Sequence, residues 1–212
     1  MSALTDLFTN IADAIRFKKG TSSTITASDF PSEILSLQVA GESSFKSSIA
    51  PVAWDTESDT GKQFTTTNAY GTWRIYASSR EAGDDNKTKF AFDGSDSTAW
   101  KSGEISSGQS VTIGMDFPIL ILPTQLRVLG PTYGSGYSPY SIVVEYQNID
   151  NTWDTVVNTT LPSDGSAIVQ SIVSSNWYKG MRATLTRPSA VSYSTTRILD
   201  FETVQGLWKE MT

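Results

Sequence analysis

Apolar and polar residues alternate one by one through much of the chain from residue 64 onward, and no other feature constrains the fold as strongly. Residues 111–117, 142–146 and 181–185 each carry an apolar side chain at every second position. This period is that of a strand with one buried face, because successive side chains of a strand point to opposite sides of the sheet. Further strands are predicted at about 73–79, 119–129, 153–159, 166–173 and 195–205.

Turn residues separate these runs, among them Pro123, Gly134-Ser135-Gly136, Asp150-Asn151 and the segment 162–165 (Pro-Ser-Asp-Gly). Such residues favour tight reversals of the backbone rather than long connections. About eight short antiparallel strands joined in this way predict a mainly β fold, a two-sheet sandwich of the jelly-roll kind.

The first forty residues follow a different period and predict a short α-helical hairpin. Apolar residues recur at spacings of three and four between residues 4 and 17, and Gly20 provides a stop for this helix. A second, shorter helix is predicted after the cap Thr26, as far as about Leu37. Two short amphipathic helices must bury their apolar stripes on the sandwich, on sister subunits or on a larger assembly. The residues predicted to form this attachment or oligomerisation surface are Leu4, Leu7, Phe8, Ile11, Ile15, Phe30 and Ile34.

These helices resemble a leader found in virion and tail-fibre proteins of bacteriophages. The resemblance rests on residues 11–16 (Ile-Ala-Asp-Ala-Ile-Arg) and Gly20, with Lys18-Lys19-Gly20 in place of the usual Lys-Thr-Gly. It implies attachment to a particle or assembly of a homo-oligomer such as a trimer, and it does not imply DNA binding. The alternative is a helical cap on an ordinary soluble protein.

These patterns divide the chain into a helical leader at 1–40, a linker at 41–63, a β-sandwich at 64–206 and a tail at 207–212. The linker is rich in Ser, Thr, Ala and Asp, which is typical of a loosely ordered connection.

Composition excludes several classes of function for this chain of 212 residues. Its net charge of −6 and pI near 4.6 leave no basic stripe for nucleic acid. No apolar run approaches about 20 residues, so no membrane-spanning helix is expected. The first residues lack the pattern of a signal peptide, so we expect synthesis in a cytoplasm without export by that route.

The absence of Cys and His restricts the chemistry further. Disulfides, thiolate and imidazole metal sites, Cys nucleophiles and His-based triads are all excluded. A glycosidase would need two carboxylates across a cleft, and the pairs Asp84/Asp85 and Asp93/Asp96 are the only candidates considered. An open sandwich offers no evident cleft, so we predict a protein that is not an enzyme.

One turn, residues 90–101, concentrates oxygen-bearing side chains between large apolar ones. Asp93, Asp96, Ser97 and Thr98 lie between two aromatic residues, and Gly94 permits the left-handed backbone of a tight loop. Carboxylates and hydroxyls are ligands that suit a hard cation such as calcium. Asp-Gly-Ser turns are also common in proteins that bind no metal, so a plain turn remains the alternative.

Several strings in the second part of the chain together resemble the discoidin family, also called coagulation-factor type-C or galactose-binding-like. They are residues 91–94 (Ala-Phe-Asp-Gly), 97–100 (Ser-Thr-Ala-Trp), 140–146, 151–153 (Asn-Thr-Trp) and a last strand that ends at Gly206. The family includes many carbohydrate-binding modules, and the resemblance implies a jelly-roll fold.

The same resemblance implies a structural calcium ion held by Asp93, Asp96 and Thr98, with an acidic residue of the last strand completing the shell. Glu202 is one residue away from the usual position for that role, so either Glu202 or Asp200 could serve. Residues 177–182 (Trp-Tyr-Lys-Gly-Met-Arg) also depart from the family's usual Arg-Tyr-Val-Arg string. Ligand contacts made from that strand in other members therefore cannot be carried over.

Sugars bind by stacking on aromatic rings while polar side chains take their hydroxyl groups. Tyr133 and Tyr137 lie in a Gly-rich loop, and Tyr70 and Arg74 lie in another turn-rich stretch, so these four are the predicted ligand-binding residues. Trp177-Tyr178 forms a third aromatic group. The alternative is that these rings pack against their own loops or a neighbouring subunit.

Three hypotheses of function follow. The first is a phage virion protein, on the tail or the head, whose leader contacts other virion proteins or sister subunits and whose sandwich binds a carbohydrate of the host surface. The second is a purely structural virion component that binds no glycan. The third is a carbohydrate-binding module of a cellular glycosidase system.

Overall fold

The fold was analysed in a computed structural model, which describes residues 9, 11–13, 26, 62–132, 140–189 and 194–211. The chain divides into two compact units, Met1–Glu42 and Ser43–Thr212. In the first unit Thr9 and residues 11–13 are helical, and Ala12 is buried. These positions fall within the first predicted helix. The other predicted attachment residues, Leu4, Leu7, Phe8, Ile15, Phe30 and Ile34, lie outside the described residues, and so does most of the predicted linker.

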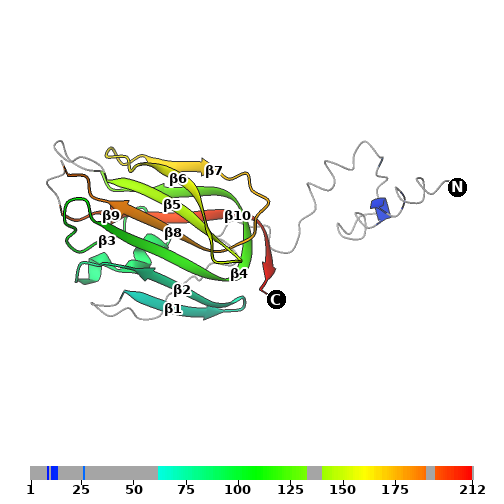
Figure 1. The fold of residues 1–212 in the computed structure, drawn as a ribbon. Helices are drawn as coiled ribbons and strands as arrows, with labels where there is room; N and C mark the ends of the chain where they lie inside the picture. The colour runs from blue at the N-terminus through cyan, green and yellow to red at the C-terminus, as the bar shows by residue number, and fades with distance from the viewer. Residues whose placement is uncertain are drawn as a thin grey trace. The chain divides into compact units, whose positions relative to one another are not determined.

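The second unit is an antiparallel β-sandwich, as predicted (Figure 1). One layer has the order β1 (Gln63–Asn68), β2 (Gly71–Ala77), β4 (Ser110–Leu129), β8 (Tyr178–Thr186), β5 (Ser141–Asn148) and β6 (Trp153–Thr160). The second half of β4 pairs with β10 (Asp200–Glu210) and β7 (Ala167–Ser171). A separate short pair is formed by β3 (Trp100–Lys101) and β9 (Arg197–Ile198).

Strand β4 joins the two layers, because its first half pairs with β2 and β8 and its second half with β10 and β7. Figure 1 shows the strand turning at one end of the sandwich and running back. The sequence predicted two strands here, 111–117 and 119–129, and the structure has one. Pro118 lies at the turn, where the pairing with β8 is irregular between Asp116 and Ile121. A proline lacks the amide that a regular ladder needs, so it is tolerated at such an irregularity.

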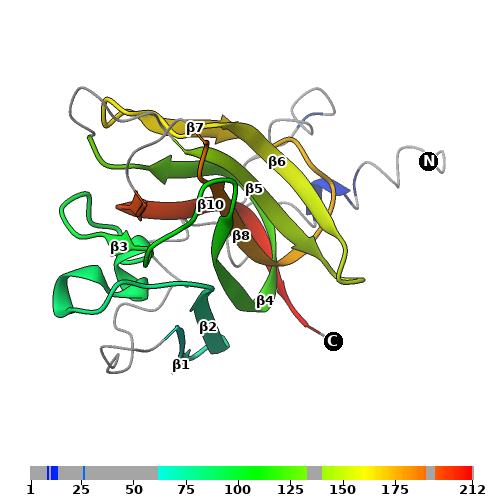
Figure 2. The same cartoon turned by 60° about the vertical axis from the view of Figure 1, so that its left-hand side comes forward.

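Two short 3-10 turns, η1 (Asp84–Asn86) and η2 (Thr88–Ala91), precede β3. Figures 1 and 2 both place these turns and β3 at the end of the sandwich away from the C-terminus. Within the described parts of the chain, no helix has the length and apolar character needed to cross a membrane.

The alternating residues fill the core as the period of two predicts. Ile113, Met115 and Phe117 of β4 are buried, and so are Met181, Ala183 and Leu185 of β8. Trp73 and Trp100 are fully buried, whereas Trp153 is partly exposed and lies under the Arg182 guanidinium, 3.9 Å from the ring centroid. Tyr146 is buried with its hydroxyl 2.6 Å from Thr203 Oγ1, and burial raises the pKa of this phenol above its usual value.

Gly114 on β4 allows a close approach that no other residue would permit. A Cβ atom at this position would lie 2.5 Å from the Tyr76 ring and 2.7 Å from the backbone oxygen of Met181. The ring of Tyr76 therefore lies against the backbone of β4, on the outer face of the layer.

We predict that Gly114→Ala lowers the free energy of unfolding by about 1–3 kcal/mol, because the added methyl group overpacks a site with backbone on one side. Urea denaturation measures the change. Ser141→Ala, at an exposed position at the start of β5, is the matched control and should change stability by less than about 0.5 kcal/mol. Equal stability of the Gly114→Ala variant and the wild type would contradict the close packing of Tyr76.

Candidate functional site

Two connections meet at the end of the sandwich where β4 turns. One is the turn between β5 and β6, residues 149–152, and the other is the segment 172–177 between β7 and β8. Lys179 of β8 follows the second connection closely, and its Nζ donates to two groups of the first, the backbone oxygen of Ile149 at 3.0 Å and Oδ1 of Asn151 at 2.7 Å. Between them lies an open cavity of about 550 Å³, lined by Asn148, Ile149, Asp150, Ser175, Asn176 and Trp177. We call this the Trp177 cavity.

The turn on one side of the Trp177 cavity is held in a defined shape. Asn151 adopts a left-handed backbone with φ 71, which Asn tolerates better than most residues. Asp150 Oδ1 accepts hydrogen bonds from the Thr152 hydroxyl at 2.6 Å and from the Thr152 backbone amide at 3.0 Å. These bonds hold the pKa of Asp150 below its usual value, so this side chain is an ionised acceptor at neutral pH.

Trp177 provides the aromatic surface of the cavity. Its ring is partly exposed, and Lys209 of β10 lies 4.5 Å from the ring centroid. A cation over one face of an indole is attractive and helps to fix the orientation of the ring. The combination of an oriented indole, two amides and an ionised carboxylate is therefore present around one open space.

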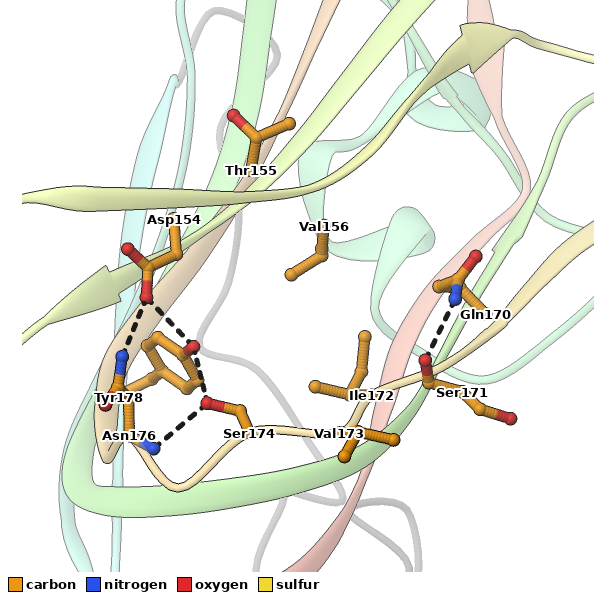
Figure 3. A pocket seen from close by; sticks show the side chains of 10 residues that line it. All are labelled: Asp154, Thr155, Val156, Gln170, Ser171, Ile172, Val173, Ser174, Asn176 and Tyr178. Carbon is orange, nitrogen blue, oxygen red and sulfur yellow. Dashed lines mark hydrogen bonds between the residues drawn. The ribbon is translucent and has the colours of Figure 1, made fainter.

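A second cavity of about 260 Å³ lies on the other side of the segment 172–177, and Figure 3 shows it from close by. Asp154 Oδ2 accepts from Asn176 Nδ2 at 3.1 Å and from the Tyr178 hydroxyl at 3.0 Å. The Tyr178 hydroxyl also lies 3.0 Å from Ser174 Oγ, which in turn accepts from the Asn176 backbone amide at 2.9 Å. This network orients Asn176, which lines both cavities.

Hydrogen bonds from Asn148, Asn176 and Tyr178 hold the pKa of Asp154 below its usual value. Burial raises the pKa of the Tyr178 phenol above its usual value. At neutral pH the network therefore contains a charged acceptor and a neutral hydroxyl donor. Asp154 thus fixes the side-chain amide of Asn176, a residue that also lines the Trp177 cavity.

The predicted ligand residue Tyr70 lies in the turn between β1 and β2 and packs edge to face on Trp208, with the ring centroids 5.2 Å apart. Both rings line a third cavity of about 340 Å³ together with Pro118, Ile119 and Glu210. Tyr70 is thus placed at a cavity, but a different one from that of Trp177.

Arg74, the second predicted ligand residue in this stretch, lies on the outer face of the sheet. Its Nε donates to Asp116 Oδ2 at 2.6 Å, and the guanidinium lies 5.4 Å from the Tyr76 ring centroid. Burial and the nearby Asp116 raise the pKa of Tyr76 to about 12. Arg74 is not among the residues that line the third cavity beside Tyr70. Tyr133 and Tyr137 lie outside the described residues.

The acidic turn has the left-handed glycine that the sequence predicted, with Gly94 at φ 72. Its two carboxylates, those of Asp93 and Asp96, are exposed. Asp93 accepts from the Ser95 amide at 2.9 Å and from the Thr98 hydroxyl at 2.7 Å. Both oxygens of Asp96 accept from the Arg127 guanidinium, each at 3.0 Å.

The fourth predicted metal ligand, Glu202 of β10, lies opposite Arg127 in the β4–β10 register, and the alternative ligand Asp200 also accepts from Arg127 Nη1. The acidic residues thus gather near a guanidinium. Within the described residues, no three acidic side chains come together as a metal site. This arrangement does not fit a calcium ion on these residues, since a cation already occupies the centre of the cluster.

Trp177 and the Asp150-Asn151 turn are recognisable in the sequence but were not among the predicted ligand-binding residues, and neither were Asn148, Asp154 and Asn176. A turn signal and an aromatic residue far apart in the chain do not reveal that they share a cavity. The alternation of the strands could have placed Asn148 and Trp153 at one end of the sheet. The segment 172–177 has no periodic pattern in its sequence, so its path could not be predicted.

Comparison with known proteins finds no matching family model and no matching curated sequence. The fold is similar to that of several solved structures. One is CpGH89CBM32-5 from Clostridium perfringens, in complex with GalNAc-β-1,3-galactose, at 12% identity and a TM-score of 0.50, covering 62% of this chain and 94% of that one. Another is the family 32 carbohydrate-binding module of C. perfringens NanJ, in complex with galactose, at 12% identity and a TM-score of 0.52, covering 67% and 98%.

A third similar structure is the C-terminal domain of a chitobiase from Bacteroides fragilis, at 19% identity and a TM-score of 0.52, covering 68% of this chain and 98% of that one. At these identities the likeness is one of fold. It confirms the predicted discoidin-like sandwich.

We predict that Asp154→Asn lowers stability at neutral pH, because the ionised carboxylate accepts hydrogen bonds that an amide cannot fully replace. The folded-state pKa of Asp154 is lowered, so its contribution is present above the unfolded value of about 3.9 and is lost as the pH falls through the folded value. Thermal unfolding of both proteins between pH 3 and 7 should show a difference that narrows below about pH 4. A difference that stays constant over this range would contradict the proposed role of the charge.

Proposed function

We propose that the sandwich is a non-catalytic carbohydrate-binding module and that its ligand binds at the Trp177 cavity. The observation that carries the proposal is the partly exposed Trp177 ring beside Asn148, Asp150 and Asn176 around one open space. An aromatic platform with a few oriented polar groups is the usual chemistry of a sugar site.

The polar groups of the cavity suit the hydroxyl groups of a neutral sugar. The ionised Asp150 accepts hydrogen bonds, whereas the amides of Asn148 and Asn176 can both donate and accept. Two lysines, Lys179 and Lys209, lie close to Asp150 and Trp177, and the two carboxylates of Asp150 and Asp154 balance their charge. The site thus has no excess of positive charge to select an anionic sugar, and a neutral ligand is proposed.

The fold comparison supports the same class of function. Two of the similar structures contain a bound galactose or a galactose-containing disaccharide. The match with this sandwich covers 94% and 98% of those two chains. This support concerns the class of ligand only, and the particular sugar is not inferred from it. Of the three hypotheses drawn from the sequence, the carbohydrate-binding module is the one that the comparisons favour.

The virion role is a narrower proposal that depends only on the resemblance of the first forty residues to phage leaders. The comparisons do not support it. If the leader attaches the sandwich to a particle or to sister subunits, display of several copies would raise the avidity of a weak sugar site. Attachment and oligomerisation are therefore proposed separately from sugar binding. Light scattering of the full chain measures the oligomeric state.

We expect a glycan array probed with the full chain to identify a neutral sugar, and isothermal titration with that sugar to give saturable binding. Trp177→Ala should weaken binding by about tenfold or more, because stacking on an aromatic ring contributes about 1–3 kcal/mol in comparable sites. Arg74→Ala, on the outer face of the sheet, is the matched control and should bind as the wild type does.

Tyr70→Ala distinguishes the two aromatic cavities. If Tyr70→Ala loses sugar binding and Trp177→Ala keeps it, the sugar binds in the cavity beside Trp208 and the proposed site is wrong. An array without hits for a folded protein would contradict sugar binding altogether and would leave the structural role as the better hypothesis.

A further inference from the structure

We propose that Arg127 is the cation that fastens the acidic turn to the sandwich, in the role that the discoidin resemblance assigns to calcium. The proposal is independent of where sugar binds. It concerns three segments that are distant in sequence: the turn with Asp96, the end of β4 with Arg127, and the start of β10 with Asp200.

The guanidinium joins the three segments by direct contacts. Nη1 and Nη2 of Arg127 each donate to one oxygen of Asp96 at 3.0 Å, and Nη1 also donates to Asp200 Oδ2. Such a bidentate arrangement fits the planar fork of arginine, and a lysine could not reproduce it.

Burial gives the two contacts different weights. The side chain of Asp200 is 0% exposed, that of Arg127 is 24% exposed, and that of Asp96 is 60% exposed. An ion pair with a fully buried carboxylate is costly to break, because the remaining charge has no water around it. The exposed pair with Asp96 contributes less to stability, and its role is to hold the turn.

The charges near Arg127 favour a cationic side chain there. Its guanidinium contacts two carboxylates, those of Asp96 and Asp200, and Glu202 is its register partner across the β4–β10 ladder. Hydrogen bonding to Asp96 and the fields of Asp200 and Asp96 raise the pKa of Arg127 further, so its charge is permanent.

A divalent ion on the same carboxylates would have to compete with this guanidinium. Both oxygens of Asp96 accept from it, and both oxygens of Asp93 accept from groups of the turn itself. A second cation a few ångströms from Arg127 would be repelled by it. The carboxylates become available to a metal only when the arginine is removed.

The experiment compares thermal unfolding of the full chain in chelator and in millimolar calcium. We expect the melting temperature of the wild type to be the same in both, because a ligand raises it only when it binds the native state. A wild-type melting temperature that rises with calcium and falls with chelator would overturn the proposal and restore calcium as the fastening ion.

Arg127→Ser removes the cation and leaves its carboxylates without a partner of opposite charge. In chelator its melting temperature should fall by roughly 10 °C. Calcium at about a hundred times its Kd should then raise it by roughly 5–10 °C. If the variant is unfolded in chelator, recovery of the native circular dichroism on adding calcium gives the same answer, and no response to calcium contradicts the proposal.

Two further variants separate charge from geometry. Arg127→Lys keeps the positive charge but loses the fork, so it should fold, melt below the wild type and show no response to calcium. Arg182→Ser removes a guanidinium from another ion pair, that with Glu145 at 2.7 Å, and is the matched control without a calcium response. Wild-type stability of Arg127→Lys, or a calcium response in either variant, would contradict the role of the fork.

Discussion

The backbone pairing of one strand determines how the sandwich is built. β4 spans 20 residues and hydrogen-bonds to β2 and β8 along its first half and to β10 and β7 along its second. Since every buried amide and carbonyl needs a partner, the strand can pass from one layer to the other only where the ladder is interrupted. Pro118 lies at that interruption. The described cavities lie at the end of the sandwich where β4 reverses its direction.

The same strand connects the cavity beside Tyr70 and Trp208 with the acidic turn. At its turn, β4 supplies Pro118 and Ile119 to the cavity beside Tyr70 and Trp208. Further along, it carries Arg127, which contacts Asp96 and the buried Asp200. The ion cluster around Arg127 and the cavity beside Tyr70 and Trp208 therefore involve separate parts of one strand. Separation of this kind allows the cavity to vary without disturbing the contacts that hold the turn.

Parts of the structure that obey a local period were predictable from the sequence. The alternation in 111–117 and 181–185 gave the buried face of β4 and β8 correctly, and the glycine of the acidic turn has the predicted backbone. The contacts of Arg127 were not predictable, because an arginine within a strand does not reveal which distant carboxylates it meets. For the same reason the sequence indicated a metal ion at this turn, in the role that we propose for Arg127. The Trp177 cavity depends on two connections without periodic pattern, and only their spatial proximity identifies it.

The different surroundings of the tryptophans make the indoles unequal as optical reporters. Trp73 and Trp100 are fully buried, whereas Trp177 is partly exposed beside Lys209. Solvent relaxation shifts the emission of an exposed indole to longer wavelengths, and a buried indole is shielded from it. A molecule that settles on Trp177 would thus alter the red edge of the intrinsic fluorescence, to which the partly exposed Trp153 and Trp208 also contribute, while the blue edge stays constant. Replacing Trp153 and Trp208 with phenylalanine would leave Trp177 as the optical reporter of this surface among the described tryptophans.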